Sequence, residues 1–501
     1  MDSLGAAHIE PGTGRSRSRR WGVAMQLVVG VLAVVLAAAA SVGIVYYPRT
    51  VTLVLAAVVL VALSVRYPKT AAGLIVLASL AGNEIGQHVS SAKVIDDAAI
   101  IVYAVVVLGT TLWSTRRLKA FPGWRWLLLF VVLGAIASLI RSPLVWAAED
   151  AYLFLKGALF TWAVAQLDWS QADVKRIIRW GAAVGGVILV FCALNLLLPG
   201  RWYGWFTASP TASVRFASLR SLVGPFVHPG VLGQVAALLA AAFAAYALAF
   251  RRWKSPVVGA VLSAAAVVLT FRRKALIALC AAVATPIVAR SRRWLLTLGI
   301  IVLIVVVVAL AAWPLTSTLV KKTYNEYVAN DSPAARVVLY RTSGEIAVDF
   351  FPLGAGFARY GSWMASTHYS PLYKTYGIDQ VPGMGPGSTE LTDTFWPAIL
   401  GETGVFGLIA YALFLVAIFN VARHLARKPD PYVMFLGLLG CAWWVEFIIE
   451  SVAAASYTSP PAYVLFFGLA GVMAAFGRKV IEPRPSRGLG AWLRRRRPAR
   501  P

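Results

Sequence analysis

The sequence is poor in charge: only 14% of its 501 residues are Asp, Glu, Lys or Arg, whereas 59% are hydrophobic. Roughly a quarter of the residues in an average soluble domain are charged, and a soluble core could not bury this much apolar surface. The apolar residues also come in long runs, and the stretch from Trp294 to Trp313 has no charge at all. Roughly 20 apolar residues of helix cross the hydrocarbon layer, and backbone polar groups in lipid must be paired within their own segment. The sequence therefore predicts an all-α, polytopic bundle of transmembrane helices.

Acidic residues are scarce as well, because 21 Asp and Glu stand against 47 Lys and Arg, for a net charge of +26. Such a charge can indicate nucleic-acid binding. Here the basic residues form short clusters beside the apolar runs, which is how cytoplasmic loops and anionic lipid surfaces are marked. We therefore expect membrane lipids, and no nucleic acid, as partners of these clusters.

Cysteine is nearly absent. Cys192, Cys280 and Cys441 all lie inside apolar runs, so neither a disulfide framework nor a metal site is indicated, and we expect no metal and no cofactor. A cleaved signal peptide is also missing. A polar segment ending in Arg19 and Arg20 precedes an apolar run of about 25 residues, which is too long for a signal sequence and predicts an anchor with its N-terminus in the cytoplasm.

The apolar runs predict about 14 spanning helices. They divide the chain into a cytoplasmic tail (1–20), helices 1–11 (21–313), a long loop (314–394), helices 12–14 (395–477) and a basic tail (478–501). The spans are placed at 22–47, 50–65, 70–89, 94–113, 124–140, 145–166, 179–198, 229–250, 255–271, 274–289, 293–313, 395–421, 431–453 and 461–477.

Loop charge orients these helices. If the N-terminus lies inside, every inner connection is basic, and this agreement predicts an even number of spans with both termini in the cytoplasm. The basic residues of the inner connections are Arg66 and Lys69; Arg116, Arg117, Lys119 and Arg125; Lys175, Arg176 and Arg179; Arg251, Arg252 and Lys254; Arg290, Arg292 and Arg293; Arg423, Arg427 and Lys428.

One connection is far longer than the others. Residues 314–394 form a loop of about 80 residues, and loops of this length are usually functional or disordered. The sequence favours an ordered loop, because aromatic residues such as Phe350, Phe357 and Trp363 recur along it. Asp331-Ser332-Pro333 predicts a capped helix over the following residues, as far as Phe350. We expect this loop to lie outside the cytoplasm and to contain helices.

Outer connections should be poor in Arg and Lys, and Arg272-Arg273-Lys274 breaks this rule between two apolar runs. Three cations in a tight outer turn predict an anion site at two helix ends, most naturally for phosphate. The alternatives are that the spans are shifted in register or that these side chains simply reach out of the membrane to water.

Two other outer places are basic. Arg215 and Arg220 precede His228-Pro229-Gly230 at a helix start, an arrangement compatible with an anion pocket, although a histidine there can also serve as a cap or pack locally. Arg336 and Arg341 lie on the loop helix and are only partly on one face. They can either bind an anion or form a solvated surface in which one pairs with Glu345.

Four segments in order resemble the O-antigen ligase and O-antigen polymerase superfamily. RSLVGPFVHPGVLG (Arg220 to Gly233) resembles its R…G-x-F-x-(N/H)-P-N-x-L stretch, and TFRRKALIAL (Thr270 to Leu279) resembles its (T/S)-x-S-R-(G/T)-A turn. RTSGEIAVDFFPLGAGF (Arg341 to Phe357) resembles the loop segment that ends in P-x-x-G-x-G-x-G. DTFWPAILGETGVFGLIAY (Asp393 to Tyr411) resembles the H-N-x-Y-L…L-x-E-x-G-(I/L)-x-G entry into the next helix. The order of these segments and the long loop between them also match over roughly residues 210–420.

The resemblance implies a membrane glycosyltransferase of the GT-C-like class that processes undecaprenyl-diphosphate-linked glycans at the outer face of the bacterial cytoplasmic membrane, by inversion and without metal. It implies that Arg272 or Arg273, Arg220 or Arg215, and Arg341 or Arg336 contact the diphosphate. Asp393 would take the place of the base that activates the acceptor hydroxyl. This sequence has Asp393 where ligases carry His, and Gly230 where the family carries Asn. Asp is frequent at the first of these places in polymerases, so polymerase is favoured over ligase. The diphosphate-binding residues are then Arg215, Arg220, His228, Arg272, Arg273, Lys274, Arg336 and Arg341.

A second hypothesis is a flippase for lipid-linked oligosaccharides or another polytopic transporter. Transporters usually show two related halves, and neither half of this chain mirrors the other. For a polymerase we expect a polyprenyl-diphosphate-linked glycan as substrate, and a flippase and chain-length or export proteins as partners.

Overall fold

The computed structural model describes residues 48–88, 95–206, 215–216, 219–291 and 335–481, together with isolated positions between 293 and 303. The expected N-terminal tail and first span (1–47), the beginning of the long loop (314–334) and most of the basic C-terminal tail lie outside the described residues.

Helices dominate the described chain, and their bounds follow the apolar runs closely. The span expected at 229–250 is helix α9 (Pro229–Phe250), and the one expected at 431–453 is α18 (Pro431–Ser451). The remaining long helices are α2 (Pro48–Arg66), α3 (Pro68–His88), α4 (Ile95–Thr115), α5 (Trp124–Arg141), α6 (Leu144–Gln166), α7 (Gln171–Leu197), α10 (Lys254–Leu269), α11 (Arg273–Arg290), α17 (Trp396–Ala426) and α19 (Ala462–Ile481).

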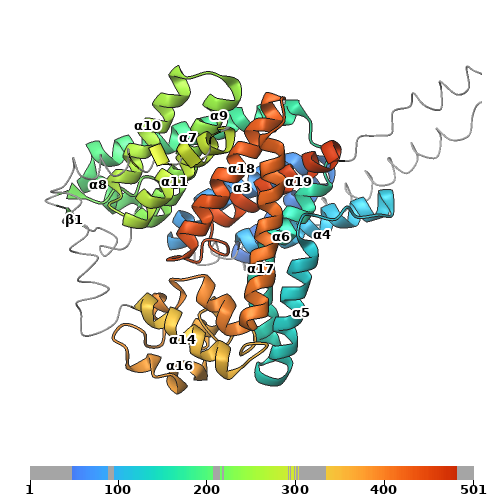
Figure 1. Ribbon diagram of the computed structural model, residues 1–501, viewed down its shortest axis with the longest axis vertical. Coiled ribbons are helices and arrows are strands. Elements are labelled where there is room, and N and C mark those ends of the chain that lie inside the picture. The colour runs from blue at the N-terminus through green and yellow to red at the C-terminus, as the bar shows by residue number, and fades with distance from the viewer. Residues whose placement is uncertain are drawn as a thin grey trace, which may run out of the picture.

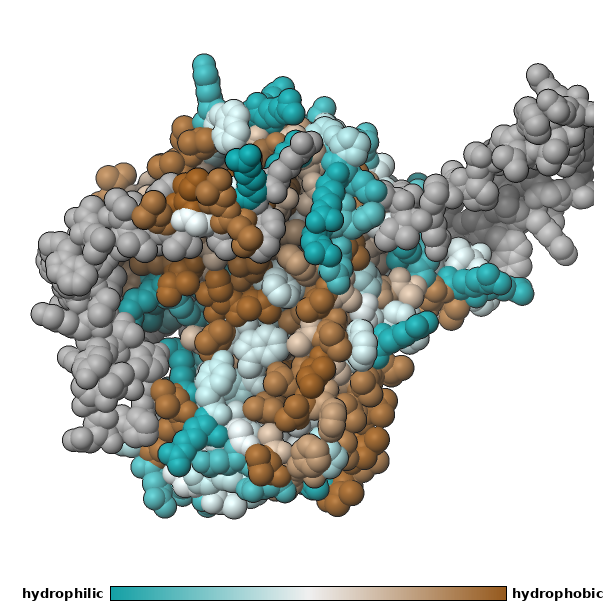
Figure 2. All heavy atoms as spheres, in the orientation of Figure 1, coloured by the Kyte–Doolittle hydropathy of each residue, from teal (hydrophilic) through white to brown (hydrophobic). Residues whose placement is uncertain are grey.

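Within the described residues, six helices are long and apolar enough to cross a membrane, and α2, α3, α10 and α19 carry shorter apolar stretches. Large hydrophobic side chains also point outward, including Val105, Leu139 and Ile140, which are 66%, 68% and 81% exposed. Figure 2 shows hydrophobic residues over much of the middle of one face, with hydrophilic residues gathered at its upper and lower ends. An apolar belt between polar ends is the surface that a bilayer requires.

Two groups of helices make up the bundle (Figure 1). In one, α9 packs against α10 and α11; in the other, α5 packs against α17, and α6 packs against α19. Helix α18 packs against both α9 and α17 and so joins the two groups. Small residues allow close approach: α9 buries a row of alanines, from Ala236 to Ala249. At Gly157, a Cβ would lie 2.1 Å from the ring of Phe467. Such small-residue contacts are typical of helices that pack in lipid.

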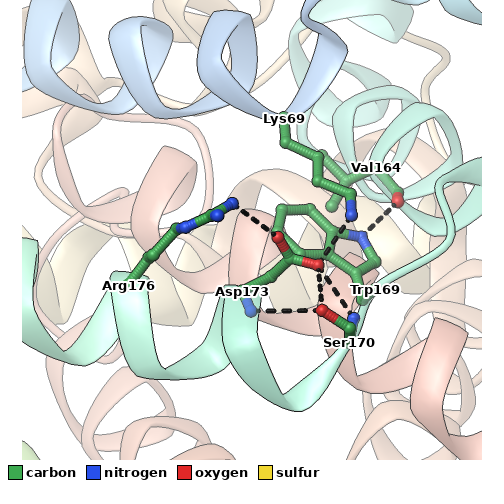
Figure 3. Close-up of polar contacts among 6 residues, drawn as sticks. All are labelled: Lys69, Val164, Trp169, Ser170, Asp173 and Arg176. Atoms are coloured by element: carbon green, nitrogen blue, oxygen red, sulfur yellow. Dashed lines mark hydrogen bonds and ion pairs between the residues drawn. The ribbon is translucent and has the colours of Figure 1, made fainter.

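One polar cluster fixes the connection between α6 and α7 (Figure 3). Ser170 caps α7 in a reciprocal capping box with Asp173, which satisfies backbone N–H groups at the helix start. Lys69 of α3 donates to Asp173 at 2.6 Å, and Arg176 lies 3.4 Å from the same carboxylate. Lys69 also lies 5.4 Å from the ring of Trp169. This cluster therefore joins α3 to α7 at one end of the bundle.

The described part of the long loop folds into a small helical unit, residues 335–394, which we call the loop unit. It contains α14 (Ala335–Asp349), α15 (Trp363–Thr367), α16 (Pro371–Thr375) and the 3-10 turns η4 (Ile378–Gln380) and η5 (Thr389–Thr392). Its own core includes Leu339, Ile346, Tyr360 and Tyr373. The Tyr360 hydroxyl donates to the carbonyl of Leu339 at 2.9 Å.

Helix α17 joins the loop unit through a break in its first turns. Gly404 has φ 66 and ψ −172, which is not helical. The carbonyls of Gly401 and Glu402 accept hydrogen bonds from the amides of Ala355 and Gly356, both at 2.8 Å. Non-helical backbone at membrane depth is tolerated where protein pairs it, and here the glycine-rich segment of the loop unit does so.

Candidate functional site

Three parts of the chain converge where the loop unit meets the bundle: the start of α9, the turn between α10 and α11, and the loop unit itself. They bring together His228, Arg272, Arg336 and Asp393, which we call the cationic cluster. Arg272 Nη2 lies 3.1 Å from His228 Nε2, and Arg336 donates to Asp393 Oδ2 at 2.7 Å. The charges of Arg336 and Asp393 both act on Arg272, so the two contacts belong to one site.

A buried approach segment places His228. The amides of Val223 and Gly224 donate to Asn195 Oδ1 at 3.0 and 3.2 Å. The amide of Leu222 donates to the carbonyl of Leu269, at the end of α10. His228 then caps α9, with Pro229 as the first helical residue, a position where proline costs no hydrogen bond.

The ring of His228 is surrounded by hydrogen-bond donors. Its Nδ1 accepts from the amide of Gly230 at 3.0 Å, and its Nε2 faces Arg272 at 3.1 Å. A neutral imidazole has one acceptor and one donor nitrogen, so one of these two contacts always sets two donors against each other. An anionic oxygen beside Nε2 and Arg272 would accept from both.

Positive surroundings keep His228 neutral. The ring keeps an exposed edge, but loss of hydration against the protein, together with the charges of Arg272 and Lys274, lowers its pKa to about 4, and Asp393 opposes this shift. At neutral pH the histidine is therefore a hydrogen-bond donor without a charge.

Arg272 sits at a strained turn. The preceding Phe271 has φ 53, a conformation that bulky residues rarely adopt and that tends to occur at functional positions. The Nε of Arg272 is buried and has no hydrogen-bond partner among the described residues. Loss of hydration and the nearby charge of Arg336 lower the pKa of Arg272, while Asp393 acts in the opposite direction. A guanidinium in this position gains from a bound anion.

The carboxylate of Asp393 lies at the exposed side of the cationic cluster. Asp393 follows η5, and its side chain is 45% exposed. Two residues later the chain is tied to the end of α18, because the Phe395 amide donates to Ser451 O at 3.3 Å and Trp396 Nε1 donates to Ser451 Oγ at 2.9 Å. Tyr340, on the same helix as Arg336, donates its hydroxyl to Val452 O at 3.0 Å.

Lys274 lies next to the cluster, but its charge is compensated. Its ammonium group lies 2.9 Å from Glu450 Oε2 and donates to Ala453 O at 3.0 Å. Glu450 is 1% exposed. Lys274 therefore ties α11 to α18, and it influences the site through its field on His228.

Two other candidate residues, Arg341 and Arg220, contact groups outside the cationic cluster. Arg341 is 81% exposed and pairs with Glu345 at 3.0 Å. Arg220 lies 5.1 Å from the ring of Tyr203, and Arg215 pairs with Arg220 in a two-residue antiparallel ladder. Arg273 is the first residue of α11.

Sequence reasoning did not identify the carboxyl pair beneath the loop unit. Asp150 and Glu402 are both completely buried, and Asp150 Oδ2 accepts from the amide of Ala358 at 2.9 Å. Glu402 Oε1 accepts from the amides of Arg359 and Tyr360 and from the Ser362 hydroxyl, at 2.7 to 3.0 Å. The sequence signal was Glu402 itself, within GETG, but nothing in the sequence indicated its partners.

Comparison with protein families identifies the middle of the chain. Residues 258–412 match the family model described as O-antigen ligase. The resemblance found in the sequence is therefore confirmed over this segment. The six long apolar helices are those of an integral membrane protein. Arg272, Arg336 and Asp393 lie inside the match, and His228 lies before it. No curated protein matches the chain.

Proposed function

We propose that the protein is an inverting, metal-independent glycosyltransferase that transfers an oligosaccharide from a polyprenyl diphosphate, acting as a polymerase rather than a ligase. The acceptor would be a second lipid-linked glycan at the outer face of the bacterial cytoplasmic membrane. The observation that carries this proposal is the cationic cluster, in which Arg272 contacts a neutral histidine and Arg336 pairs with the carboxylate of Asp393.

The cationic cluster suits the leaving group. As the bond between the sugar and the diphosphate breaks, negative charge grows on the phosphate oxygens. Arg272 Nη2 and His228 Nε2 lie 3.1 Å apart, close enough for one phosphate oxygen to accept from both, and donors already held in place stabilise developing charge without reorganisation. A guanidinium can also hold phosphate oxygens in bidentate fashion.

Asp393 suits the acceptor. In an inverting displacement the acceptor hydroxyl oxygen bonds to the anomeric carbon, the bond from that carbon to the diphosphate oxygen breaks, and the hydroxyl proton passes to a base. The Asp393 carboxylate is half exposed and pairs with Arg336. A bound diphosphate competes with this carboxylate for Arg336, so binding of the donor would release Asp393 to act as the base.

The same proposal orients the protein. The loop unit would lie outside the cytoplasm, and both termini inside. Its support is the distribution of charge, since the basic connections, including the two that contribute Lys69 and Arg176 in Figure 3, follow the positive-inside pattern.

The test is to express single variants in bacteria that supply the lipid-linked repeat unit and to measure glycan length. Arg272→Gln, Arg336→Gln and Asp393→Asn should each lower the rate of polymerisation, by roughly 10²–10³ for a positioned donor, and single repeat units should accumulate on the outer leaflet. Arg341→Gln is the matched control on the same helix, because Arg341 is exposed and pairs with Glu345; it should leave glycan length unchanged.

Two results would refute the proposal. Normal glycan in all three site variants would show that the cationic cluster is not the site. Accumulation of repeat units on the inner leaflet would instead favour a flippase.

A further inference from the structure

A second pair of arginines, Arg141 and Arg359, lies where α5 meets the loop unit. Arg141 is the last residue of α5, whose lower end in Figure 1 lies beside the unit that contains α14 and α16. Arg359 follows the glycine-rich segment that pairs with the break in α17. None of the residues of the cationic cluster belongs to these segments.

Hydrogen bonds join both arginines, or their neighbours in the chain, to the surrounding structure. Arg141 donates through Nη1 to the carbonyl of Gly354 at 2.8 Å, and the next residue, Ser142, donates its hydroxyl to Phe357 O at 2.8 Å. The Arg359 amide donates to buried Glu402 at 2.9 Å. Arg141 also lies over the ring of Phe350, at 5.0 Å. The backbone on which the two arginines lie is therefore held in place.

Their charges are not neutralised by neighbouring acids. Among the residues that the structure describes, no carboxylate forms an ion pair with Arg141 or Arg359. The buried acids Asp150 and Glu402 bind the backbone of the loop unit instead, since they accept from the amides of Ala358 and Arg359 at 2.9 Å each. The Nε of Arg359 is buried without a hydrogen-bond partner in this part of the chain. Loss of hydration and repulsion by Arg141 lower the pKa of Arg359.

A structural role explains only one member of the pair. A cation at the end of a helix is favoured by the helix dipole, and Arg141 also clamps the loop unit. The side chain of Arg359 makes no such contact among the described residues, although burying a guanidinium next to a like charge is unfavourable. A bound anion would remove both the repulsion and the unsatisfied donor.

We propose that Arg141 and Arg359 form a second anion site, which binds a phosphate group carried by a lipid. Within the proposed function, on which this assignment rests, that lipid is the acceptor: a polymerase joins two glycans that both carry a polyprenyl diphosphate, whereas the cationic cluster binds only the donor.

The experiment uses the full chain purified in detergent, with farnesyl diphosphate as the probe and native mass spectrometry to count bound molecules. The wild type should bind two equivalents. Arg359→Gln and Arg272→Gln should each retain one, and the double variant should retain none. Arg359→Lys keeps the charge and should bind the second equivalent with less than a tenfold loss of affinity. Arg341→Gln, the exposed control, should bind two.

The outcomes separate the two assignments. The second site would be overturned if Arg359→Gln still bound two equivalents of the probe. It would also be overturned if the double variant, with Arg141→Gln added, still bound both. Loss of one equivalent with Arg359→Gln but none with Arg272→Gln would refute the proposed donor site and leave the second site standing. A second arm adds phosphatidylglycerol. If this lipid displaces the probe at the Arg359 site at equal concentration, the site takes a phospholipid headgroup and the acceptor assignment is wrong.

Discussion

Replacing Gly404 with alanine should destabilise the junction between α17 and the loop unit. Gly404 has φ 66 and ψ −172, a region used almost only by glycine, and another residue there costs roughly 1–3 kcal/mol. A Cβ would lie 2.6 Å from the carbonyl oxygen of Pro352 and 2.9 Å from the nitrogen of Gly354. Both atoms belong to the backbone, so the segment must shift, at a further cost of roughly 1–3 kcal/mol. The total is roughly 2–6 kcal/mol.

The matched control is Gly109→Ala in α4. A Cβ at Gly109 has no atom within 4 Å, and alanine is favoured over glycine in a helix by roughly 1 kcal/mol. Thermal unfolding in detergent should therefore show a lower melting temperature for Gly404→Ala and an equal or higher one for Gly109→Ala.

Amide hydrogen exchange gives the local readout. The amides of Ala355 and Gly356 donate to carbonyls that the break in α17 leaves free, so both should exchange faster in Gly404→Ala. If the two alanine variants melt together and the protection of these amides is unchanged, the break is not what holds the loop unit to α17.

Three further predictions follow from single contacts. Arg272→Gln should raise the pKa of His228 from about 4 toward its ordinary value of 6.5 without reaching it, because loss of hydration, the largest cause, remains; histidine-labelled NMR would detect this. A pKa that is lower in the folded state makes the free energy of unfolding fall as the pH drops from about 6.5 toward 4, and this fall should be smaller in the variant; an unchanged pKa would refute the contact. Glu402→Ala leaves three donors of residues 359–362 without their acceptor, at roughly 1–3 kcal/mol each. Deuterium uptake there should rise more than in Glu402→Gln, which keeps an acceptor oxygen, and equal uptake would argue against this role. Lys69→Met should lower the free energy of unfolding by about 1 kcal/mol or less, since the Lys69 side chain is 35% exposed. Asp173→Asn should lower it by a similar amount. In thermal unfolding, the double variant should lose less stability than the sum of the two single variants.

The length of the apolar runs is a property of the sequence alone, and it placed the helices. A run that must cross the hydrocarbon layer has to pair its backbone internally, so its ends are set locally; α9 begins and ends where the apolar pattern does. The helix that follows Pro333 was predicted from its cap sequence, which is also a local feature, and α14 lies there.

Part of the candidate site was also visible in the sequence. Arg272 and Arg336 stood out because outer connections should be poor in cations, and Asp393 because residues 393–411 resemble the family pattern. Their side chains come together only through the packing of α9, α11 and the loop unit. Arg336 and Arg341 were equivalent candidates, and the helix separates them: five residues turn roughly 140° around its axis, so one contacts Asp393 and the other pairs with Glu345.

The carboxyl pair and the second pair of arginines were decided by the tertiary structure. Asp150 and Glu402 are 252 residues apart in sequence number, and neither belongs to a local pattern that requires the other. What joins them is the glycine-rich segment, which fits against the break at Gly404 only because glycines lie on both sides of the contact. The sequence by itself determined which segments form long apolar helices, because hydrophobic length is local; the fold determined which charges meet at their ends, because those contacts depend on how distant helices pack.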